Sequence, residues 1–176
     1  ITGFDLTAAM LAIAKQRLLA YENVQLTQQN VVDLELHRQY EMAFSYGGVW
    51  YFVMDGINEP FLVSHSYDAQ ANVRGFERVS QYVQTNGHLL LGVQGPHRNY
   101  NSPITNGYVY SQTVQPIEHG FTKHYFLHDK DEKLMEQSID YRTYAFSDAL
   151  ELLSAFGFTY EPSAVDMPQF LRFVKS

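Results

Sequence analysis

The 176-residue sequence contains no cysteine, which excludes a disulfide framework, a thiolate metal site and a cysteine nucleophile. It has no apolar run of about 20 residues, the length that spans a bilayer, and its start is not a charged leader followed by an apolar signal core. Lys and Arg number 12 against 19 Asp and Glu, and no segment gathers the basic residues into a stripe that neutralises phosphates. We therefore expect a cytoplasmic protein that binds neither nucleic acid nor a membrane.

The sequence does contain enough apolar and aromatic residues for one globular domain covering residues 1–176. Apolar residues make up 45% of the chain and charged residues 18%, which is ordinary for a domain with a sizeable core. The 13 Tyr and 12 Phe serve mainly in packing. Tyrosine also combines a flat ring with a polar tip, which suits cavities for small polar ligands.

Short apolar runs alternate with helical patterns in the first half of the chain. Strands are expected at residues 1–5, 24–27, 42–45 and 88–93, and helices at 7–19 and 67–85. This alternation is typical of a doubly wound, mostly parallel, Rossmann-like α/β sheet with both faces covered. Thr7 is the expected N-cap of the first helix, and Asn86-Gly87 are expected to end the second.

The pattern changes after residue 107. Partial alternation separated by turn residues occurs over 108–114, 121–127 and 134–143. It predicts an added antiparallel sheet within residues 107–144 of the same domain. The aromatic segment 49–66 has no clear period and fits either a lid or an ordinary connection.

The end of the chain predicts a last helix followed by two strands. Ser147 is the expected cap of that helix and Gly157 its end. The strands are expected at residues 158–160 and 170–174, the last of them antiparallel.

Two polar residues follow the first two predicted strands. Asp5 ends the first strand directly before a helix, where a carboxylate accepts hydrogen bonds from both ribose hydroxyls of a nucleotide. Asn30 follows the second strand, where its side-chain oxygen would accept from an adenine amino group while the Val31 amide meets a ring nitrogen. The ordinary alternatives are a helix cap for Asp5 and a tight turn for Asn30. The adenosine site therefore requires these two groups to lie side by side on one edge of a sheet.

Residues 3–15, Gly-Phe-Asp-Leu-Thr-Ala-Ala-Met-Leu-Ala-Ile-Ala-Lys, resemble the second strand and following helix of class I S-adenosylmethionine-dependent methyltransferases. Asn30-Val31 falls where that family holds adenine, and residues 45–48 fall where its fourth strand opens on the methyl-transfer centre. Residues 85–91 resemble its approach to the fifth strand. The resemblance implies S-adenosylmethionine as cofactor. The residues it implies as cofactor-binding are Asp5, Leu6, Met10, Asn30, Val31 and Ser45.

The run His97-Arg98-Asn99-Tyr100 is similar to the glycine and sarcosine N-methyltransferases, and the antiparallel strands are similar to the sugar-amine dimethyltransferases. This narrower resemblance implies that Arg98 anchors an acid group of the acceptor through its planar guanidinium. The glycine-specific branch has Asn near Gly47, so glycine is not the expected acceptor. Candidate catalytic residues are Tyr46 and His97, and candidate acceptor-binding residues beside Arg98 are Trp50, Tyr100 and Tyr144.

The sequence departs from the family in lacking the glycine-rich loop that follows the first strand. In the family's strand order that first strand lies between the strand of Asp5 and the strand of Phe44. Two unpaired ladders in a buried place are not tolerable. We therefore expect an upstream segment, not contained in this sequence, to supply the strand and the loop.

The function expected from these features is methyl transfer to a small-molecule acceptor, with an amine nitrogen as the favoured acceptor atom. One alternative is an NAD-type oxidoreductase, because an acid after the second strand serves either ribose. The other is a non-catalytic, methyltransferase-like subunit. Besides the acceptor, the expected partners are further copies of the chain in a homo-oligomer.

Two other constellations are weaker. His124 and His128 fall on one face of a strand near His119 and Asp129, but nothing fixes a third ligand, so no metal site is predicted. Ser45 and a histidine do not make a hydrolase pair, because the sequence has no Gly-x-Ser-x-Gly elbow.

Overall fold

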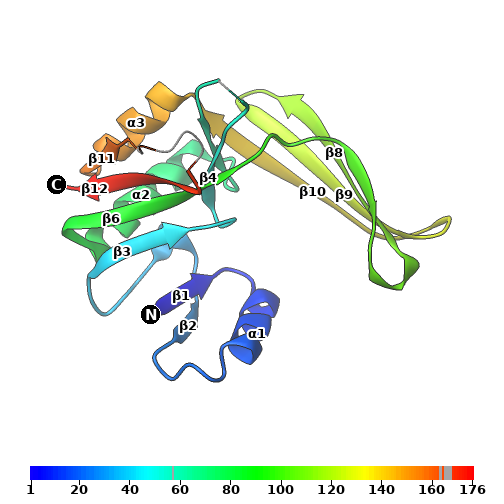
Figure 1. Cartoon of the computed structure of the whole chain (residues 1–176), viewed down its shortest axis with the longest axis horizontal. Coiled ribbons are helices and arrows are strands. Elements are labelled where there is room, and N and C mark those ends of the chain that lie inside the picture. Colours follow the sequence, from blue (N-terminus) through cyan, green and yellow to red (C-terminus); the bar gives the residue numbers. More distant parts are fainter. Residues whose placement is uncertain (57, 163, 165–167) are drawn as a thin grey trace.

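The computed structural model describes residues 1–56, 58–162, 164 and 168–176. They form one large mixed sheet and a small separate one (Figure 1). The helices are α1 (Ala8–Arg17), α2 (Ala69–Tyr82) and α3 (Phe146–Ser154), with 3-10 turns η1 (Val31–Asp33) and η2 (Thr105–Gly107). The strands are β1 (Thr2–Asp5), β2 (Gln25–Gln28), β3 (Tyr40–Ser45), β4 (Trp50–Val53), β5 (Phe61–Ser64), β6 (Val83–Gln94), β7 (Tyr100–Pro103), β8 (Val109–Ile117), β9 (Gly120–Asp129), β10 (Glu132–Tyr144), β11 (Phe158–Glu161) and β12 (Phe170–Lys175).

The large sheet has the order β11-β12-β6-β4-β5-β10-β9-β8-β7, and β3 also pairs with β6. Strands β3 and β4 run parallel to β6. Strand β12 runs antiparallel to β6, with Leu171 opposite Leu91. The structure therefore confirms the predicted parallel centre and the antiparallel last strand.

The predicted antiparallel strands are present, but they extend the core sheet and do not form a sheet of their own. Strand β10 pairs with β5, Arg142 opposite Ser64, and β5 pairs with β4. Both linking strands lie in segment 49–66, which the sequence left unassigned. The four residues of β4 are all buried, and a strand covered on both faces shows no alternation to read.

Side chains from α2, α3 and the core strands form the main hydrophobic core on one face of the sheet. Trp50 stacks on Phe76 with ring centroids 3.9 Å apart. The Trp50 indole and the Ser64 hydroxyl both donate to the Asn72 side-chain oxygen, at 2.8 and 2.5 Å. Asn72 in turn donates to the carbonyl of Ser66 at 2.9 Å. This buried network ties β4 and β5 to α2.

The structure corrects two expected helix boundaries. Helix α2 ends at Tyr82, before Asn86-Gly87, and those two residues lie within β6, where Asn86 has φ 63°. The strand register with β3 jumps there from Val83 to His88. Ser147 lies inside α3, whose N-cap is Ala145.

Thr7 does occupy the N-cap of α1, but its side chain makes no capping bond. The Asp5 carboxylate accepts the Thr7 amide instead.

Strands β1 and β2 pair in parallel and form the small sheet below the large one in Figure 1. Among the described residues β1 pairs only with β2, and β3 pairs only with β6. The Tyr40 hydroxyl donates to the Thr2 hydroxyl oxygen at 2.7 Å and links the two sheets. Facing edges of β1 and β3 thus stay unpaired in the described part of the chain. The intervening strand expected from the sequence remains a prediction.

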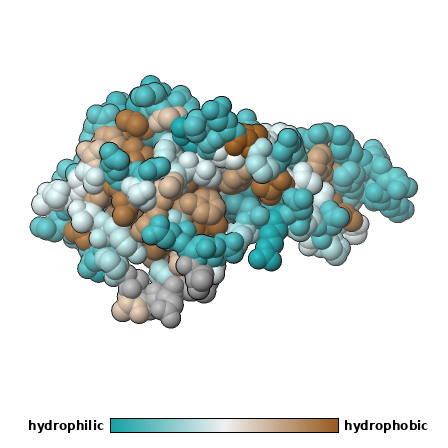
Figure 2. All heavy atoms as spheres, turned by 90° about the horizontal axis from the view of Figure 1, so that it is seen from above, coloured by the Kyte–Doolittle hydropathy of each residue, from teal (hydrophilic) through white to brown (hydrophobic). Residues whose placement is uncertain are grey.

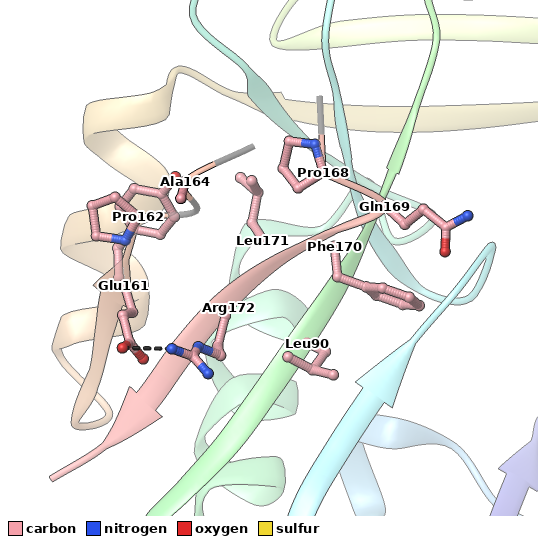
Figure 3. Close-up of a pocket in the computed structure, with 10 residues that line it drawn as sticks. Leu90, Glu161, Pro162, Ala164, Pro168, Gln169, Phe170, Leu171 and Arg172 are labelled. Carbon is pink, nitrogen blue, oxygen red and sulfur yellow. Dashed lines mark ion pairs between the residues drawn. The ribbon is translucent and has the colours of Figure 1, made fainter. Parts of the chain in front are cut away.

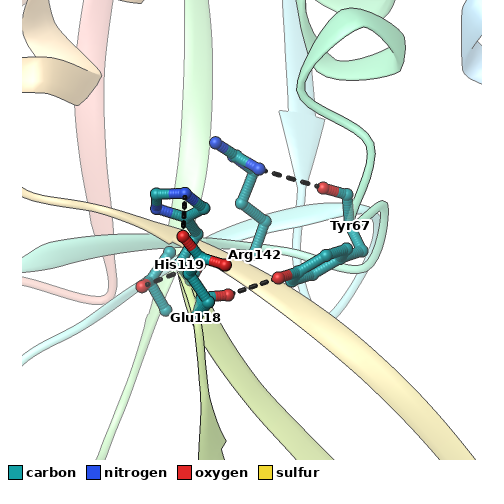
Figure 4. Close-up of polar contacts among 5 residues, drawn as sticks. Tyr67, Glu118, His119 and Arg142 are labelled. Atoms are coloured by element: carbon teal, nitrogen blue, oxygen red, sulfur yellow. Dashed lines mark hydrogen bonds and ion pairs between the residues drawn. The ribbon is translucent and has the colours of Figure 1, made fainter.

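Strands β8, β9 and β10 form a long arm that projects from the core (Figure 1). Its far end, around Lys130 to Lys133, presents a hydrophilic surface (Figure 2). At the base, the Tyr67 hydroxyl donates to the carbonyl of Glu118, and Arg142 donates to the carbonyl of Tyr67 at 3.3 Å (Figure 4). These bonds fasten the β8–β9 turn to the segment that leads into α2.

Candidate functional site

Asp5 and Asn30 lie at the same edge of the small sheet, as the adenosine hypothesis requires. In the parallel register Asp5 is opposite Gln28, and Asn30 follows two residues later. The Asp5 carboxylate accepts the Thr7 amide at 2.7 Å, and the Asn30 side-chain oxygen accepts the Val32 amide at 3.3 Å. Both side chains therefore also hold local structure, Asp5 in the turn before the N-cap Thr7 and Asn30 as the N-cap of η1. A carboxylate has more acceptor positions than this one bond uses, so both roles are compatible.

The other predicted cofactor-binding residues differ in what they expose. Leu6 is 63% exposed and Met10 55% exposed, so both present apolar surface beside Asp5. The Val31 side chain is buried in the core, which leaves its main chain as the part that a ligand can meet. The Ser45 hydroxyl, at the end of β3, donates to the carbonyl of Trp50 at 2.9 Å. That bond holds the β3–β4 turn closed.

His97 follows the end of β6 and folds back against β4. Its Nε2 lies 3.0 Å from the Tyr51 hydroxyl, and its ring lies 5.2 Å from that of Phe121. Burial, together with the positive charge of Lys123, lowers the pKa of His97 to about 4. Burial also raises the pKa of Tyr51 well above its ordinary value. At neutral pH both partners of this hydrogen bond are therefore uncharged.

His97 belongs to a group of aromatic and basic side chains that the sequence did not reveal as a unit. We call it the inner-face cluster: Tyr51, His65, His97, Phe121, Lys123, Tyr125 and Tyr141. It lies on the face of the sheet opposite the main core, around a second set of buried apolar residues. The signal was present in β9, where Phe121, Lys123 and Tyr125 alternate onto one face. Its significance depends on β4, β5 and β10 continuing the same sheet as β9.

Lys123 is the cation of this cluster and is 7% exposed. Its Nζ lies 5.0 Å from the centroid of the Tyr141 ring and 5.8 Å from that of Phe121. Burial lowers the pKa of Lys123 to about 8. The Tyr125 and Tyr141 hydroxyls lie 2.7 Å apart and are hydrogen-bonded to each other. The cluster thus combines one ammonium with paired hydroxyls and ring faces.

The structure places Trp50 inside the main core and Tyr144 against it. Trp50 is 2% exposed and its indole is hydrogen-bonded inside the main core, so it has no surface for an acceptor. Tyr144 packs against the same core, on the face away from His97, and its hydroxyl is buried without a hydrogen-bond partner within the described residues. Aromatic residues near strand ends suggested a pocket, but these two fill the interior.

The remaining predicted residues lie at the surface. Tyr46, 67% exposed, contacts Phe170 with ring centroids 5.6 Å apart. Tyr100, 44% exposed, is 6.0 Å from the Tyr110 ring, on the face that carries the inner-face cluster. The Arg98 side chain is exposed, and only its carbonyl is held, by the Gln112 side chain at 2.9 Å. The structure thus brings Tyr100 onto the face of His97 and leaves Arg98 in solvent.

A hollow of about 750 Å³ lies elsewhere, beside β11 and β12 (Figure 3). Leu90 and Phe170 line it. Arg172 and Glu161 also line it and form an ion pair, with the guanidinium nitrogen 2.5 Å from the carboxylate oxygen. None of the predicted site residues is in the lining. Residues 163 and 165–167 lie outside the described residues, so we place no site there.

Two further observations concern the described residues alone. They contain no group of three or more His, Asp or Glu side chains placed to hold a metal ion. Nor do they include a helix with the length and apolar character needed to cross a bilayer.

No protein-family model matches this chain, and no curated protein matches it. Solved structures do. An S-adenosylmethionine-dependent methyltransferase from Clostridium acetobutylicum matches with a TM-score of 0.69 and 14% identity, over 99% of this chain and 74% of its own. A sugar N-methyltransferase from Streptoalloteichus gives a TM-score of 0.72 and 17% identity, over 99% and 70%.

A third similar structure is an amino pentose methyltransferase from Micromonospora echinaspora, solved with S-adenosylmethionine bound. It gives a TM-score of 0.63 and 13% identity, over 99% of this chain and 73% of its own. Likeness at such low identity establishes the fold, and the described geometry must support anything further.

Proposed function

We propose that this chain, whose fold is the Rossmann-like fold of the class I S-adenosylmethionine-dependent methyltransferases, transfers a methyl group to an amine nitrogen of a small-molecule acceptor. The observation that carries the proposal is the placement of Asp5 and Asn30 on one edge of the parallel β1–β2 pair. In open α/β sheets ligands bind at the carboxyl ends of the strands, which is where both side chains lie.

These residues fit the adenosine half of the cofactor. The Asp5 carboxylate would accept from the ribose hydroxyls and the Asn30 side chain would bind the adenine edge. The exposed Leu6 and Met10 side chains supply an apolar surface that a purine ring can cover. When bound, the cofactor supplies an electrophilic methyl group on a sulfonium sulfur.

The chemistry asks the protein mainly to hold a neutral amine in line with the methyl group, because proximity and alignment lower the barrier by several kcal/mol. His97 is suited to orienting that amine. With its proton on Nε2, it donates to the Tyr51 oxygen, and Nδ1 is left to accept an N–H of the acceptor. A base with a pKa of about 4 does not retain the proton of an alkylammonium product. The proton therefore leaves to water, and His97 acts by positioning.

The choice of acceptor in this proposal draws on the names of the similar solved structures. One of them is named a sugar N-methyltransferase and another an amino pentose methyltransferase, which supports an amine as acceptor. The exposed Tyr46 at the end of β3 and Tyr100 on β7 are the proposed contacts of the acceptor's outer part. We also propose that the protein works in the cytoplasm and forms a homo-oligomer.

The test is isothermal titration of the full-length protein with S-adenosylhomocysteine, for wild type, Asp5→Ala and Glu35→Ala. Asp5→Ala should weaken binding by about tenfold or more, because it removes a charge-assisted hydrogen bond to the ribose. Glu35→Ala removes an exposed carboxylate just beyond Asn30 and should leave the affinity unchanged.

Circular dichroism of each variant establishes that it is folded. Tight binding that Asp5→Ala leaves intact would remove the cofactor assignment. Binding of NADH in place of S-adenosylhomocysteine would favour the oxidoreductase, and binding of neither by the full-length protein would favour a non-catalytic subunit.

A further inference from the structure

Lys123 is a buried cation without an anionic partner. Its side chain is more than nine-tenths buried, and within the described residues its Nζ forms no ion pair. The ammonium makes cation–π contacts with the faces of the Tyr141 and Phe121 rings. Lysine is almost never buried so fully unless it is paired, so this arrangement calls for an explanation.

The carboxylate closest in the strand register does not reach it. Lys123 lies opposite Ile139 on β10, and the next residue, Asp140, therefore points to the other face of the sheet. There the Asp140 carboxylate accepts the Thr122 hydroxyl at 2.6 Å. The ion pairs of the arm and of β12, Lys133 with Glu136 and Arg172 with Glu161, also lie away from this face.

The groups around Lys123 include a hydrogen-bond donor besides the ammonium. When Tyr125 and Tyr141 bond to each other, one hydroxyl donates and the other keeps a hydrogen to offer. Burial holds the pKa of Tyr125 above its ordinary value, so that this phenol stays protonated. An ammonium and a free hydroxyl hydrogen on a face lined by rings make a suitable partner for an oxyanion.

The ammonium is not fully enclosed by the protein. Within the described residues, some side-chain nitrogens are fully buried and have no hydrogen-bond partner, but the Lys123 Nζ is not one of them. Part of the remaining accessible surface therefore belongs to Nζ. An anion that reached it would meet a partly desolvated charge, where attraction is stronger than at an exposed one such as Arg98.

We propose that the inner-face cluster binds a carboxylate or phosphate group of the acceptor, with Lys123 as the cationic partner. Calling the ligand the acceptor rests on the proposed methyltransferase function, whereas the anion site itself rests on the geometry around Lys123. His97, hydrogen-bonded to Tyr51 in the same cluster, would then hold the acceptor amine near its acid group.

The direct test is carbon-13 NMR of the lysine Cε groups in the full-length protein, titrated separately with inorganic phosphate and with acetate. We expect a saturable shift of the Lys123 signal and a rise in its pKa from about 8, because a bound anion stabilises the ammonium. A response to phosphate alone assigns a phosphorylated acceptor, a response to acetate alone assigns a carboxylate, and a response to both supports the shared chemistry. No saturable response to either anion overturns the proposal.

Three variants sharpen the result. Lys123→Met should weaken anion binding by about tenfold or more. Lys133→Met, an exposed lysine on the arm, should leave anion binding unchanged, and so should Arg98→Ala. Loss in Arg98→Ala with retention in Lys123→Met would place the anion at Arg98 and overturn the proposal. If Lys123→Met does not fold by circular dichroism, the wild-type titration decides.

Titration with S-adenosylhomocysteine, run beside these, separates the two proposals. Binding of S-adenosylhomocysteine without an anion response means that the Lys123 site fails and the proposed function stands. An anion response without S-adenosylhomocysteine binding means that the site stands and its ligand is not a methyl acceptor.

Discussion

At the scale of single residues, His97 is defined by what surrounds it. Tyr51 holds its Nε2, Phe121 packs on its ring, and Lys123 adds a positive charge nearby. Burial disfavours the imidazolium by excluding water, and the positive charges of Lys123 and His65 disfavour it by repulsion. The neutral imidazole is therefore part of the native structure at physiological pH.

The neutral state of His97 makes the stability of the protein depend on pH. The pKa of about 4 in the folded protein lies below the ordinary value of about 6.5, so protons bind the unfolded chain more readily. The contribution of neutral His97 is fully present above about pH 6.5 and is lost as the pH falls toward 4. We expect the melting temperature of His97→Gln to fall less than that of wild type between these pH values.

Differential scanning calorimetry across this pH range measures the effect. His37→Gln, which changes an exposed histidine, is the matched control and should follow wild type. Parallel pH curves for His97→Gln and wild type would contradict a neutral, buried His97.

At the scale of elements, the join between the arm and the core depends on Gly120 at the start of β9. It lies opposite Arg142 in the strand register, and a Cβ at this position would lie 1.8 Å from the carbonyl oxygen of Tyr141. No side chain fits against backbone at that distance. Glycine is therefore required for β9 and β10 to meet at the arm's base.

We predict that Gly120→Ala destabilises the protein by about 1–3 kcal/mol through this overpacking. It should also speed hydrogen exchange at the amides of residues 139–142. Gly95→Ala is the control, because a Cβ there meets no atom within 4 Å, and it should stay within about 0.5 kcal/mol of wild type. Chemical denaturation with exchange mass spectrometry gives both readouts. An equal effect of the two substitutions would refute the packing argument.

At the scale of the whole molecule, the β1–α1–β2 unit is weakly joined to the rest. It is a two-stranded sheet, and α1 buries only Leu11 among its residues. A two-stranded sheet is marginal by itself, whereas β6 lies in the middle of the large sheet with partners on both sides.

We therefore expect the amides of β1 and β2 in residues 1–176 to exchange faster than those of β6 and β12, with an opening free energy lower by about 2 kcal/mol or more. Hydrogen exchange followed by NMR measures this directly. Saturating S-adenosylhomocysteine should slow exchange in β1 and β2 if it binds there. Equal protection of the two regions would show that the small sheet opens only with global unfolding.

The sequence by itself determined the parallel core, the antiparallel strands of the arm and the edge shared by Asp5 and Asn30. These depend on short-range periodicity and on residues that end a strand, which are local properties of the chain. The predicted fold class is confirmed by the strand order and by the similar solved structures.

Only the tertiary structure decided that Trp50 lies in the core and Tyr144 packs against it. It also decided that β4 and β5 connect the arm to the core strands. The tertiary structure decided, too, that the charge of Lys123 acts on His97, since those two residues lie in segments with no local relation. Burial on both faces erases alternation, and cross-strand neighbours are fixed by register. Neither burial on both faces nor strand register can be read from the order of residues along one segment.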